Sequence, residues 1–261
     1  MVSRVTAMCG MGATLAAVLF TVATSAHAMS LEKRSWREGV FGSAPPTDER
    51  QAGSPMVAHF EVDAGSSFVL DRRFGDTVLM RFDGSPEIWA LRPSAGPRGD
   101  VIYKNDLGEA MLRSTRLGGL TLFTPDRPQG SAVAMAGQAP GLHPITVSGM
   151  GALLQVFAQA SARAGRAAQH LISFEAVDIE AGTESLLADA AILTAEAFQQ
   201  VAGDNGEGRS KVARFNKVQF DQAKKVEVRI KGAVVQINVA PSEGLNGRPS
   251  SRRIAQELAK K

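Results

Sequence analysis

The stretch FVLDRRFGDTVLMRFDGSPEIWALRPSAGPRGDVIYKNDLGEAMLRSTRLGGLTLF, residues 68–123, decides the fold of this chain. It alternates short apolar runs with glycines, prolines and Asp-Gly pairs at nearly even spacing, which is typical of short antiparallel strands joined by tight turns. With the apolar run that precedes it, the stretch predicts about seven strands in residues 56–124, arranged as a meander, a sandwich or a barrel. The predicted strands cover residues 56–62, 68–71, 77–82, 87–91, 101–103, 110–113 and 119–123.

The sequence after this stretch changes its period. Residues 125–144 are rich in proline and glycine and are predicted to form a turn-rich connection. Residues 145–261 then favour helices and a β-hairpin: apolar residues recur at helical spacing in 149–170 and 183–201, residues 226–230 and 235–239 alternate around a Lys-Gly turn, and a serine at 250 or 251 can cap a last helix. The predicted fold class is therefore α+β.

The first 28 residues have the pattern of a signal peptide. Arg4 precedes an apolar run over residues 11–22, and Ala26-His27-Ala28 forms a small-x-small cleavage site. We therefore expect a periplasmic or secreted protein that begins near Met29, with residues 29–55 as an exposed lead-in. The alternative is an uncleaved membrane anchor, because residues 5–26 approach the length of about 20 residues that spans a bilayer.

Composition limits the classes of partner and of chemistry. The chain has 261 residues, 44% of them hydrophobic, and a net charge of +3 that falls to +2 when Arg4 is removed. This balance of charge argues against nucleic acid as a partner. The partners that remain possible are an envelope component and another protein. Cys9, the only cysteine, lies within the signal segment, so we expect no disulfide in the exported chain.

Asp63 is the candidate catalytic residue. The segment HFEVDAGSSFVL, residues 59–70, resembles the active-site loop of retroviral-type and pepsin-like aspartic proteases. That resemblance implies a homodimer, because the chain holds one such loop and the chemistry requires two close carboxylates that share a proton. The alternative interpretation is an ordinary β-turn, since Asp-x-Gly is a common turn sequence and Ala64 replaces the hydroxyl residue of the protease loop.

Arginines crowd the strand-rich part and are candidates for binding an anionic ligand, because a guanidinium pairs well with phosphate and carboxylate groups. The alternative is a solvated sheet face on which they pair with neighbouring aspartates. No phosphate-binding or nucleophile motif is present, and the histidines are isolated, so the sequence predicts no cofactor and no metal. The predicted ligand-binding arginines are Arg72, Arg73, Arg81, Arg92 and Arg98.

The motifs RFDGSPEIWALRPSAGPRGDVIYKND and TRLGGLTLFTP, with the closing GLNGRPSSRRIAQEL, resemble a family of exported bacterial proteins, the domain of unknown function 4908 family. The resemblance implies one exported globular unit, and it implies no activity, cofactor or residue role. The function predicted is a non-catalytic binding or envelope-associated protein. Two alternatives remain: a dimeric aspartic protease that uses Asp63, and a small-molecule binding barrel with a large apolar cavity.

Overall fold

The computed structural model describes residues 55–63, 65–177, 179–203 and 206–260. The predicted signal peptide and nearly all of the lead-in therefore lie outside the described residues. Within the described ranges, no helix is both long enough and apolar enough to span a bilayer.

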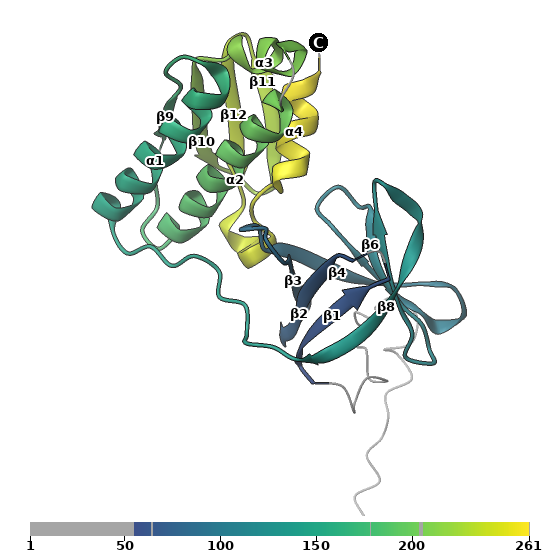
Figure 1. Ribbon diagram of the computed structural model, residues 1–261. Coiled ribbons are helices and arrows are strands. Elements are labelled where there is room, and N and C mark those ends of the chain that lie inside the picture. Colours follow the sequence, from purple (N-terminus) through teal and green to yellow (C-terminus); the bar gives the residue numbers. More distant parts are fainter. Residues whose placement is uncertain (1–54, 64, 178, 204–205, 261) are drawn as a thin grey trace, which may run out of the picture. The chain divides into compact units, whose positions relative to one another are not determined.

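Eight antiparallel strands form a closed barrel in which each strand pairs with its neighbours in the sequence (Figure 1). The last strand pairs back onto the first and closes the barrel, so the sheet has no free edge. The strands are β1 (Val57–Val62), β2 (Ser67–Phe74), β3 (Thr77–Phe82), β4 (Trp89–Ala95), β5 (Val101–Lys104), β6 (Ala110–Ser114), β7 (Leu120–Thr124) and β8 (Arg127–Gln138).

Side chains fill the interior of the barrel. In β1 the buried residues Ala58, Phe60 and Val62 alternate with more exposed ones, as a strand with one inward face requires. Phe60 stacks on Phe68 of β2 with ring centroids 5.4 Å apart, and both belong to a continuous interior cluster. The structure therefore gives no support to the alternative of a barrel that encloses a small molecule.

The strand count corrects the sequence prediction, which gave about seven strands and a turn-rich connection at residues 125–144. The eighth strand, β8, lies in that segment. It was missed because its residues are small and mostly exposed, so it lacks the apolar alternation of a strand; pairing with β7 and β1 on its two sides holds it extended.

Gly130 of β8 provides a test of this pairing. Its φ is +86°, and a Cβ placed there would lie 2.5 Å from Cγ2 of Thr121 on β7. We expect Gly130→Ala to lower the free energy of unfolding by about 2 kcal/mol, from backbone strain and crowding together. Urea unfolding measures the change. Gly151→Ala is the matched control, since Gly151 has open space around it; a loss as large in the control would contradict the interpretation.

The chain beyond residue 145 forms a four-stranded sheet in the order β11-β12-β10-β9. β10 runs parallel to both β9 and β12, whereas β11 and β12 form the antiparallel hairpin. The strands are β9 (Ser173–Ala176), β10 (Lys217–Gln222), β11 (Glu227–Lys231) and β12 (Val234–Val239). The helices are α1 (Met150–Ala168), α2 (Glu184–Ala202), α3 (Gly206–Ala213) and α4 (Ser251–Ala259), and a 3-10 segment, η3 (Pro241–Asn246), precedes α4.

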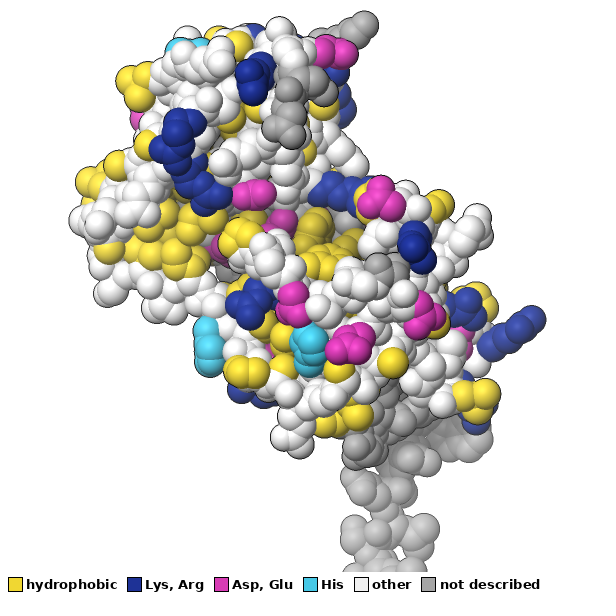
Figure 2. All heavy atoms as spheres, in the orientation of Figure 1, with side chains coloured by type: hydrophobic (Ala, Val, Ile, Leu, Met, Phe, Trp, Pro, Cys, Tyr) yellow, Lys and Arg dark blue, Asp and Glu magenta, His cyan; other side chains and the backbone are white. Residues whose placement is uncertain are grey.

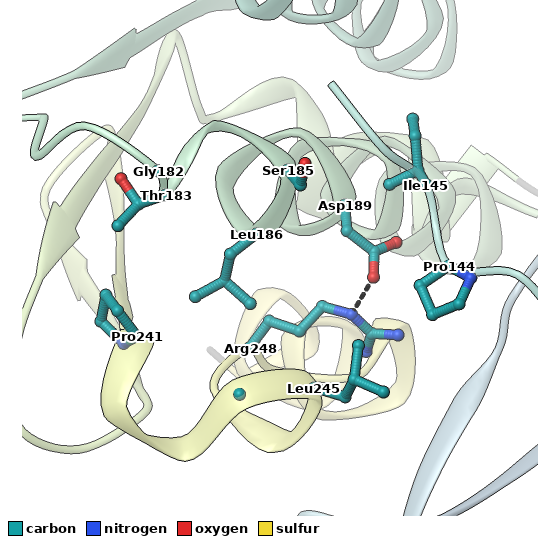
Figure 3. Close-up of a pocket in the computed structure, with 11 residues that line it drawn as sticks. Pro144, Ile145, Gly182, Thr183, Ser185, Leu186, Asp189, Pro241, Leu245 and Arg248 are labelled. Atoms are coloured by element: carbon teal, nitrogen blue, oxygen red, sulfur yellow. Dashed lines mark hydrogen bonds and ion pairs between the residues drawn. The ribbon is translucent and has the colours of Figure 1, made fainter. Parts of the chain in front are cut away.

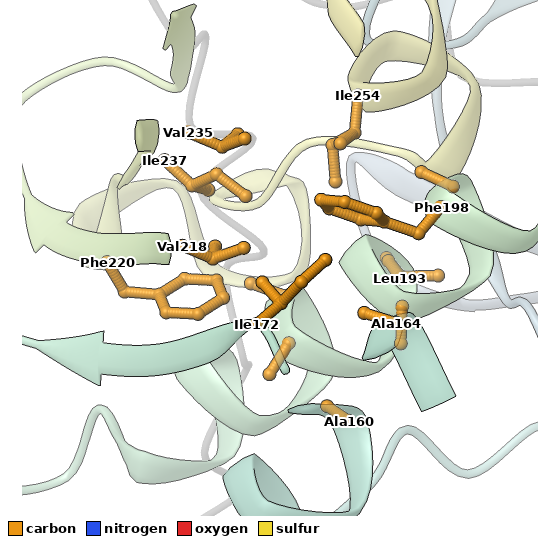
Figure 4. Packing of buried hydrophobic residues seen from close by; sticks show 14 of the residues in the cluster. Ala160, Ala164, Ile172, Leu193, Phe198, Val218, Phe220, Val235, Ile237 and Ile254 are labelled. Carbon is orange, nitrogen blue, oxygen red and sulfur yellow. The ribbon is translucent and has the colours of Figure 1, made fainter. Parts of the chain in front are cut away.

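The helices bury one face of this sheet (Figure 4). Val235 and Ile237 alternate with half-buried residues along β12, and they belong to the same cluster as Phe220 of β10 and Phe198 of α2. Ile254 of α4 joins the cluster and is also fully buried. These strands and helices thus build a second hydrophobic core, separate from the interior of the barrel.

Asp71 holds the segment after the barrel against β2. Its buried carboxylate accepts hydrogen bonds from the guanidinium of Arg73, at 2.7 Å, and from the backbone N–H of Leu142, at 2.9 Å. Burial alone would raise the pKa of Asp71, but these hydrogen bonds outweigh it and the pKa is lowered. Leu142 packs with Val69 and Leu79 on the outside of the barrel, and Leu245 of η3 packs against the same group.

Candidate binding pocket

A pocket of about 270 Å³ lies at the N-terminal end of α2 (Figure 3). Three segments form its walls: the connection before α1, the first turns of α2 with the two residues before them, and the η3 segment with the residues that follow it. Apolar side chains make up most of the lining. The lining residues are Pro144, Ile145, Gly182, Thr183, Ser185, Leu186, Asp189, Pro241, Gly244, Leu245 and Arg248.

The two hydroxyl groups in the lining bond to backbone carbonyls. Thr183 Oγ1 donates to the carbonyl of Glu180 at 2.6 Å, and Ser185 Oγ donates to the carbonyl of Val147 at 3.1 Å. Ser185 Oγ also accepts from the N–H of Val147, at 2.9 Å. Ser185 thus fixes the start of α2 against the connection before α1, whereas Thr183 also accepts a hydrogen bond from the side-chain amide of Gln222, at 2.9 Å. Neither hydroxyl bonds to a side chain that could act as a base.

Arg248 and Asp189 form the polar end of the pocket. Arg248 Nε donates to Asp189 Oδ2, and Arg248 Nη2 donates to the carbonyl of Ile88 at 2.6 Å. The Arg248 side chain is 7% exposed and that of Asp189 is 22% exposed. A buried guanidinium requires partners of this kind. The charges of Arg248 and Asp189 cancel, so the pair adds a donor and an acceptor to the apolar lining without adding net charge.

Some polar capacity of this pair is not used by the protein. Neither Arg248 Nη1 nor Asp189 Oδ1 makes a hydrogen bond within the described ranges. Both side chains reach the lining of the pocket, where Figure 3 shows the carboxylate beside Pro144 and Ile145. The two atoms lie on different sides of the ion pair, because Nη1 is on the guanidinium edge away from the Nε–H that binds Asp189.

Next to the pocket, carboxylates of the barrel cap the N-terminus of α4. Glu87 Oε1 accepts from the N–H of Ser251 at 3.0 Å, and Glu87 Oε2 accepts from its Oγ at 2.5 Å. Asp106 Oδ2 accepts from the N–H of Ser250 at 2.9 Å. Burial raises the pKa of Glu87, and the hydrogen bonds from Ser251 only partly oppose that shift. Two backbone N–H groups that a helix start leaves without partners are thus satisfied by the barrel.

The predicted catalytic residue, Asp63, lies in the turn between β1 and β2. Its side chain is exposed, and the turn is closed by a hydrogen bond from the N–H of Gly65 to the carbonyl of Val62, at 2.9 Å. Gly65 has a φ of +82°, which accounts for the glycine of the Asp-x-Gly sequence. Nothing in the described part of the chain favours the protease alternative.

The five predicted ligand-binding arginines are in different environments. Arg73 pairs with Asp71, and Arg92 pairs with Glu243 of η3. A further arginine of the strand-rich part, Arg113, pairs with Asp100, so two arginine–aspartate pairs of the kind that the alternative interpretation described are present. The three remaining candidates are half-buried or exposed: Arg72, Arg81 and Arg98. An anion-binding groove stays a prediction, and two of its five guanidinium groups are already engaged in ion pairs.

His59 has neighbours that the sequence did not indicate. Its Nε2 lies 2.7 Å from Asp83 Oδ2, and Ser67 Oγ donates to the same oxygen at 2.5 Å. Because Ser67 bonds to the carboxylate rather than to the imidazole, the three residues do not form a nucleophile–base–acid relay. In the part of the chain that the structure describes, no three His, Cys, Asp or Glu residues are grouped to hold a metal ion.

A second apolar surface lies on α1. Figure 2 shows hydrophobic side chains gathered over this helix, where Met150 is 44% exposed and Leu154 is 57% exposed. This surface has no buried polar group that would orient a ligand, unlike the pocket with Arg248 and Asp189. The pocket is therefore the better candidate site.

Sequence reasoning missed the residues that shape the pocket. Arg248 lies in the closing segment GLNGRPSSRR, which contributed to the family resemblance but was assigned no role apart from a serine that caps the last helix. Asp189 lies within the predicted helix 183–201, where a single aspartate suggests only a solvated face. The available signal was an arginine between glycine and proline, since such a residue is poorly placed for an ordinary helical surface.

Fold and pocket together define an α+β protein in which an antiparallel eight-stranded barrel is followed by a helix-covered sheet with a small, mainly apolar binding pocket. A family model described as Domain of unknown function (DUF4908) matches residues 35–258, and the chain belongs to that family, as the motifs predicted. Comparisons with curated proteins and with solved structures find no match.

Proposed function

We propose that this protein is an exported, non-catalytic binding protein of the cell envelope, and that it holds a small, neutral, mainly apolar ligand in the pocket at the start of α2. The observation that supports this most is the lining itself: apolar side chains surround one buried ion pair, Arg248–Asp189, whose charges cancel. Pockets of this composition bind apolar groups and use a few polar atoms for orientation.

The chemistry of the lining supports binding rather than catalysis. A hydroxyl nucleophile needs a neighbouring base, and the hydroxyls of Thr183 and Ser185 donate to backbone carbonyls instead. The carboxylate of Asp189 is paired with Arg248, and the residues that line the pocket include no second carboxylate that could share a proton with it. The lining thus has groups for orienting a ligand.

The exported location rests on the signal-peptide pattern of residues 1–28, and attachment to the membrane follows only if that segment is not cleaved. The test is to express the full chain in a Gram-negative bacterium, separate periplasmic and membrane fractions, and sequence the N-terminus. We expect a periplasmic chain that begins at Met29. A chain in the membrane fraction that keeps its first residues would replace export with anchoring.

Ligand-observed NMR with a mixture of neutral, apolar fragments tests the pocket. We expect saturation-transfer signals that fall at least fivefold in Leu186→Trp, because the larger side chain fills the pocket. Leu154→Trp adds the same side chain to the exposed face of α1 and is the matched control, which should keep the wild-type signals. Equal signals from the three proteins would contradict the proposed site.

A further inference from the structure

We infer that the free edge of strand β9 binds a second copy of this chain, so that the four-stranded sheets of two molecules join antiparallel across a two-fold axis at Phe174. β9 is the outer strand of its sheet, and within the described ranges it pairs only with β10 (Figure 1). A free edge presents unpaired backbone groups, which favour the addition of another strand. This surface is separate from the pocket, and the inference does not depend on the proposed ligand.

The backbone groups of alternate residues in β9 point away from β10. The N–H groups of Ser173 and Val177 donate to carbonyls of β10 and of the residue before it, at 2.9 and 3.0 Å. In a parallel pair of strands, Phe174 and Ala176 therefore turn their N–H and C=O groups to the opposite side. These groups make no hydrogen bond within the described part of the chain, so they are available to a further strand.

The side chains around β9 alternate between two faces over residues 171–177. Ile172, Phe174 and Ala176 belong to the second hydrophobic core or pack against it. Leu171 and Val177 lie on the other face of the strand, where Leu171 is 78% exposed and Val177 is 39% exposed. They lie at equal distances in sequence before and after Phe174, so the exposed apolar residues of this edge are placed symmetrically about it.

An antiparallel ladder centred on Phe174 joins complementary side chains. Leu171 of one copy lies opposite Val177 of the other, so the two exposed apolar side chains cover each other at both ends of the ladder. Ser173 lies opposite Glu175, so no like charges are opposed. A ladder centred on Glu175 would instead place two carboxylates directly opposite each other, which is destabilising. The charges thus favour the register centred on Phe174.

The same register provides partners for the free backbone groups. Phe174 exchanges two hydrogen bonds with its counterpart, and Ala176 exchanges two with Ile172 of the other copy. The carbonyl of Ile172 already accepts from Ser161 Oγ of α1, at 2.6 Å, and its second lone pair remains for the ladder. Pairing with a second copy therefore satisfies the groups that point outward along this edge.

Sedimentation velocity with the chain from residue 29 tests the self-association. We expect a monomer–dimer equilibrium, and Ala176→Pro should raise its dissociation constant at least tenfold, because proline removes an outward N–H and leaves the bonds to β10 intact. Leu171→Lys should have an effect of the same sign, since it replaces the apolar contact with Val177. Leu117→Lys is the matched control: Leu117 is 99% exposed in a turn of the barrel, and its replacement should keep the wild-type equilibrium.

A pair of cysteines tests the register. The chain from residue 29 has no cysteine of its own. Leu171→Cys combined with Val177→Cys places thiols opposite each other in the two copies, so mild oxidation should give a covalent dimer in a denaturing gel. Each single variant should remain monomeric in that gel, because its thiol lies about 20 Å from the same position in the second copy.

The possible outcomes are distinct. A wild-type chain that stays monomeric at about 0.5 mM would overturn the inference. A dimer that is unaffected by both Ala176→Pro and Leu171→Lys would also overturn it, because the interface would then lie elsewhere. A dimer that these variants weaken, but that forms no disulfide in the double cysteine variant, would overturn the register centred on Phe174. A thermal melt verifies that each variant is folded.

Discussion

Replacing Arg248 with methionine lowers the free energy of unfolding by about 3–5 kcal/mol, the range expected when one partner of a buried ion pair is removed. Methionine keeps much of the volume of the side chain, so the loss comes from the electrostatic change. The carboxylate of Asp189 is left partly buried without its partner, and the carbonyl of Ile88 loses its donor. Urea unfolding followed by circular dichroism measures the difference.

A double variant is the control for this prediction. Arg248→Met combined with Asp189→Leu removes both charges, so it should recover a large part of the lost stability, and the two single effects should not add. If the double variant is as unstable as the sum of the two single variants, the ion pair is not the cause of the loss. A single-variant loss below about 1 kcal/mol, typical of an exposed pair, would contradict the burial of Arg248.

The sequence was most informative where local pattern and tertiary structure agree. Tight turns and short apolar runs mark β1 to β7, and in β1 an alternation of buried and more exposed residues also indicates which side chains face the interior. The hairpin of β11 and β12 was equally readable, because Gly232 at its turn adopts a φ of +58°, which favours glycine. In these elements the local sequence pattern alone favours the secondary structure that the folded chain adopts.

The sequence was least informative where distant segments impose the structure. β8 is extended because two other strands pair with it, and α3 was missed because its two glycines suggest a loop. Gly208 of α3 lies so close to α2 that a Cβ there would approach the carbonyl oxygen of Val201 to 2.2 Å. The glycine therefore reflects the contact between two helices, which no local pattern indicates.

The pocket could not be predicted for the same reason. Arg248, Asp189 and Ile88 are separated by long stretches of chain and meet only after the barrel and the second sheet have folded. The site that the sequence did suggest, Asp63, depends on a local turn motif, and the structure accounts for that motif by the φ of Gly65. A turn sequence is thus compatible with a catalytic loop and with a structural one, and only the surroundings distinguish them.

We expect Glu87→Ala to lower the free energy of unfolding by about 2–3 kcal/mol at pH 5. The substitution removes the acceptor of the N–H and the Oγ of Ser251, both buried, and such donors are costly when unsatisfied. Unfolding by urea, monitored by circular dichroism at several pH values, gives the size and the pH dependence. Glu87→Gln is the matched control, because it keeps an acceptor oxygen for Ser251 and should lose much less.

The pH dependence of that loss has a definite sign. Burial raises the pKa of Glu87 in the folded state above its ordinary value, so the folded protein binds this proton more tightly than the unfolded chain. The part of this stability that depends on pH is therefore fully present below the ordinary pKa of 4.5 and is lost as the pH rises through the raised folded value, whereas the ionised carboxylate can still accept the hydrogen bonds from Ser251. Asp71 does not interact with Glu87 and cancels in the difference, whereas the charges of Asp106 and Arg248 act on Glu87 itself and are part of the effect that is measured. The loss in the free energy of unfolding caused by Glu87→Ala should thus be larger at pH 4 than at pH 8. A loss that increased with pH would contradict this prediction, because it would show that the folded protein favours the ionised carboxylate at the start of α4.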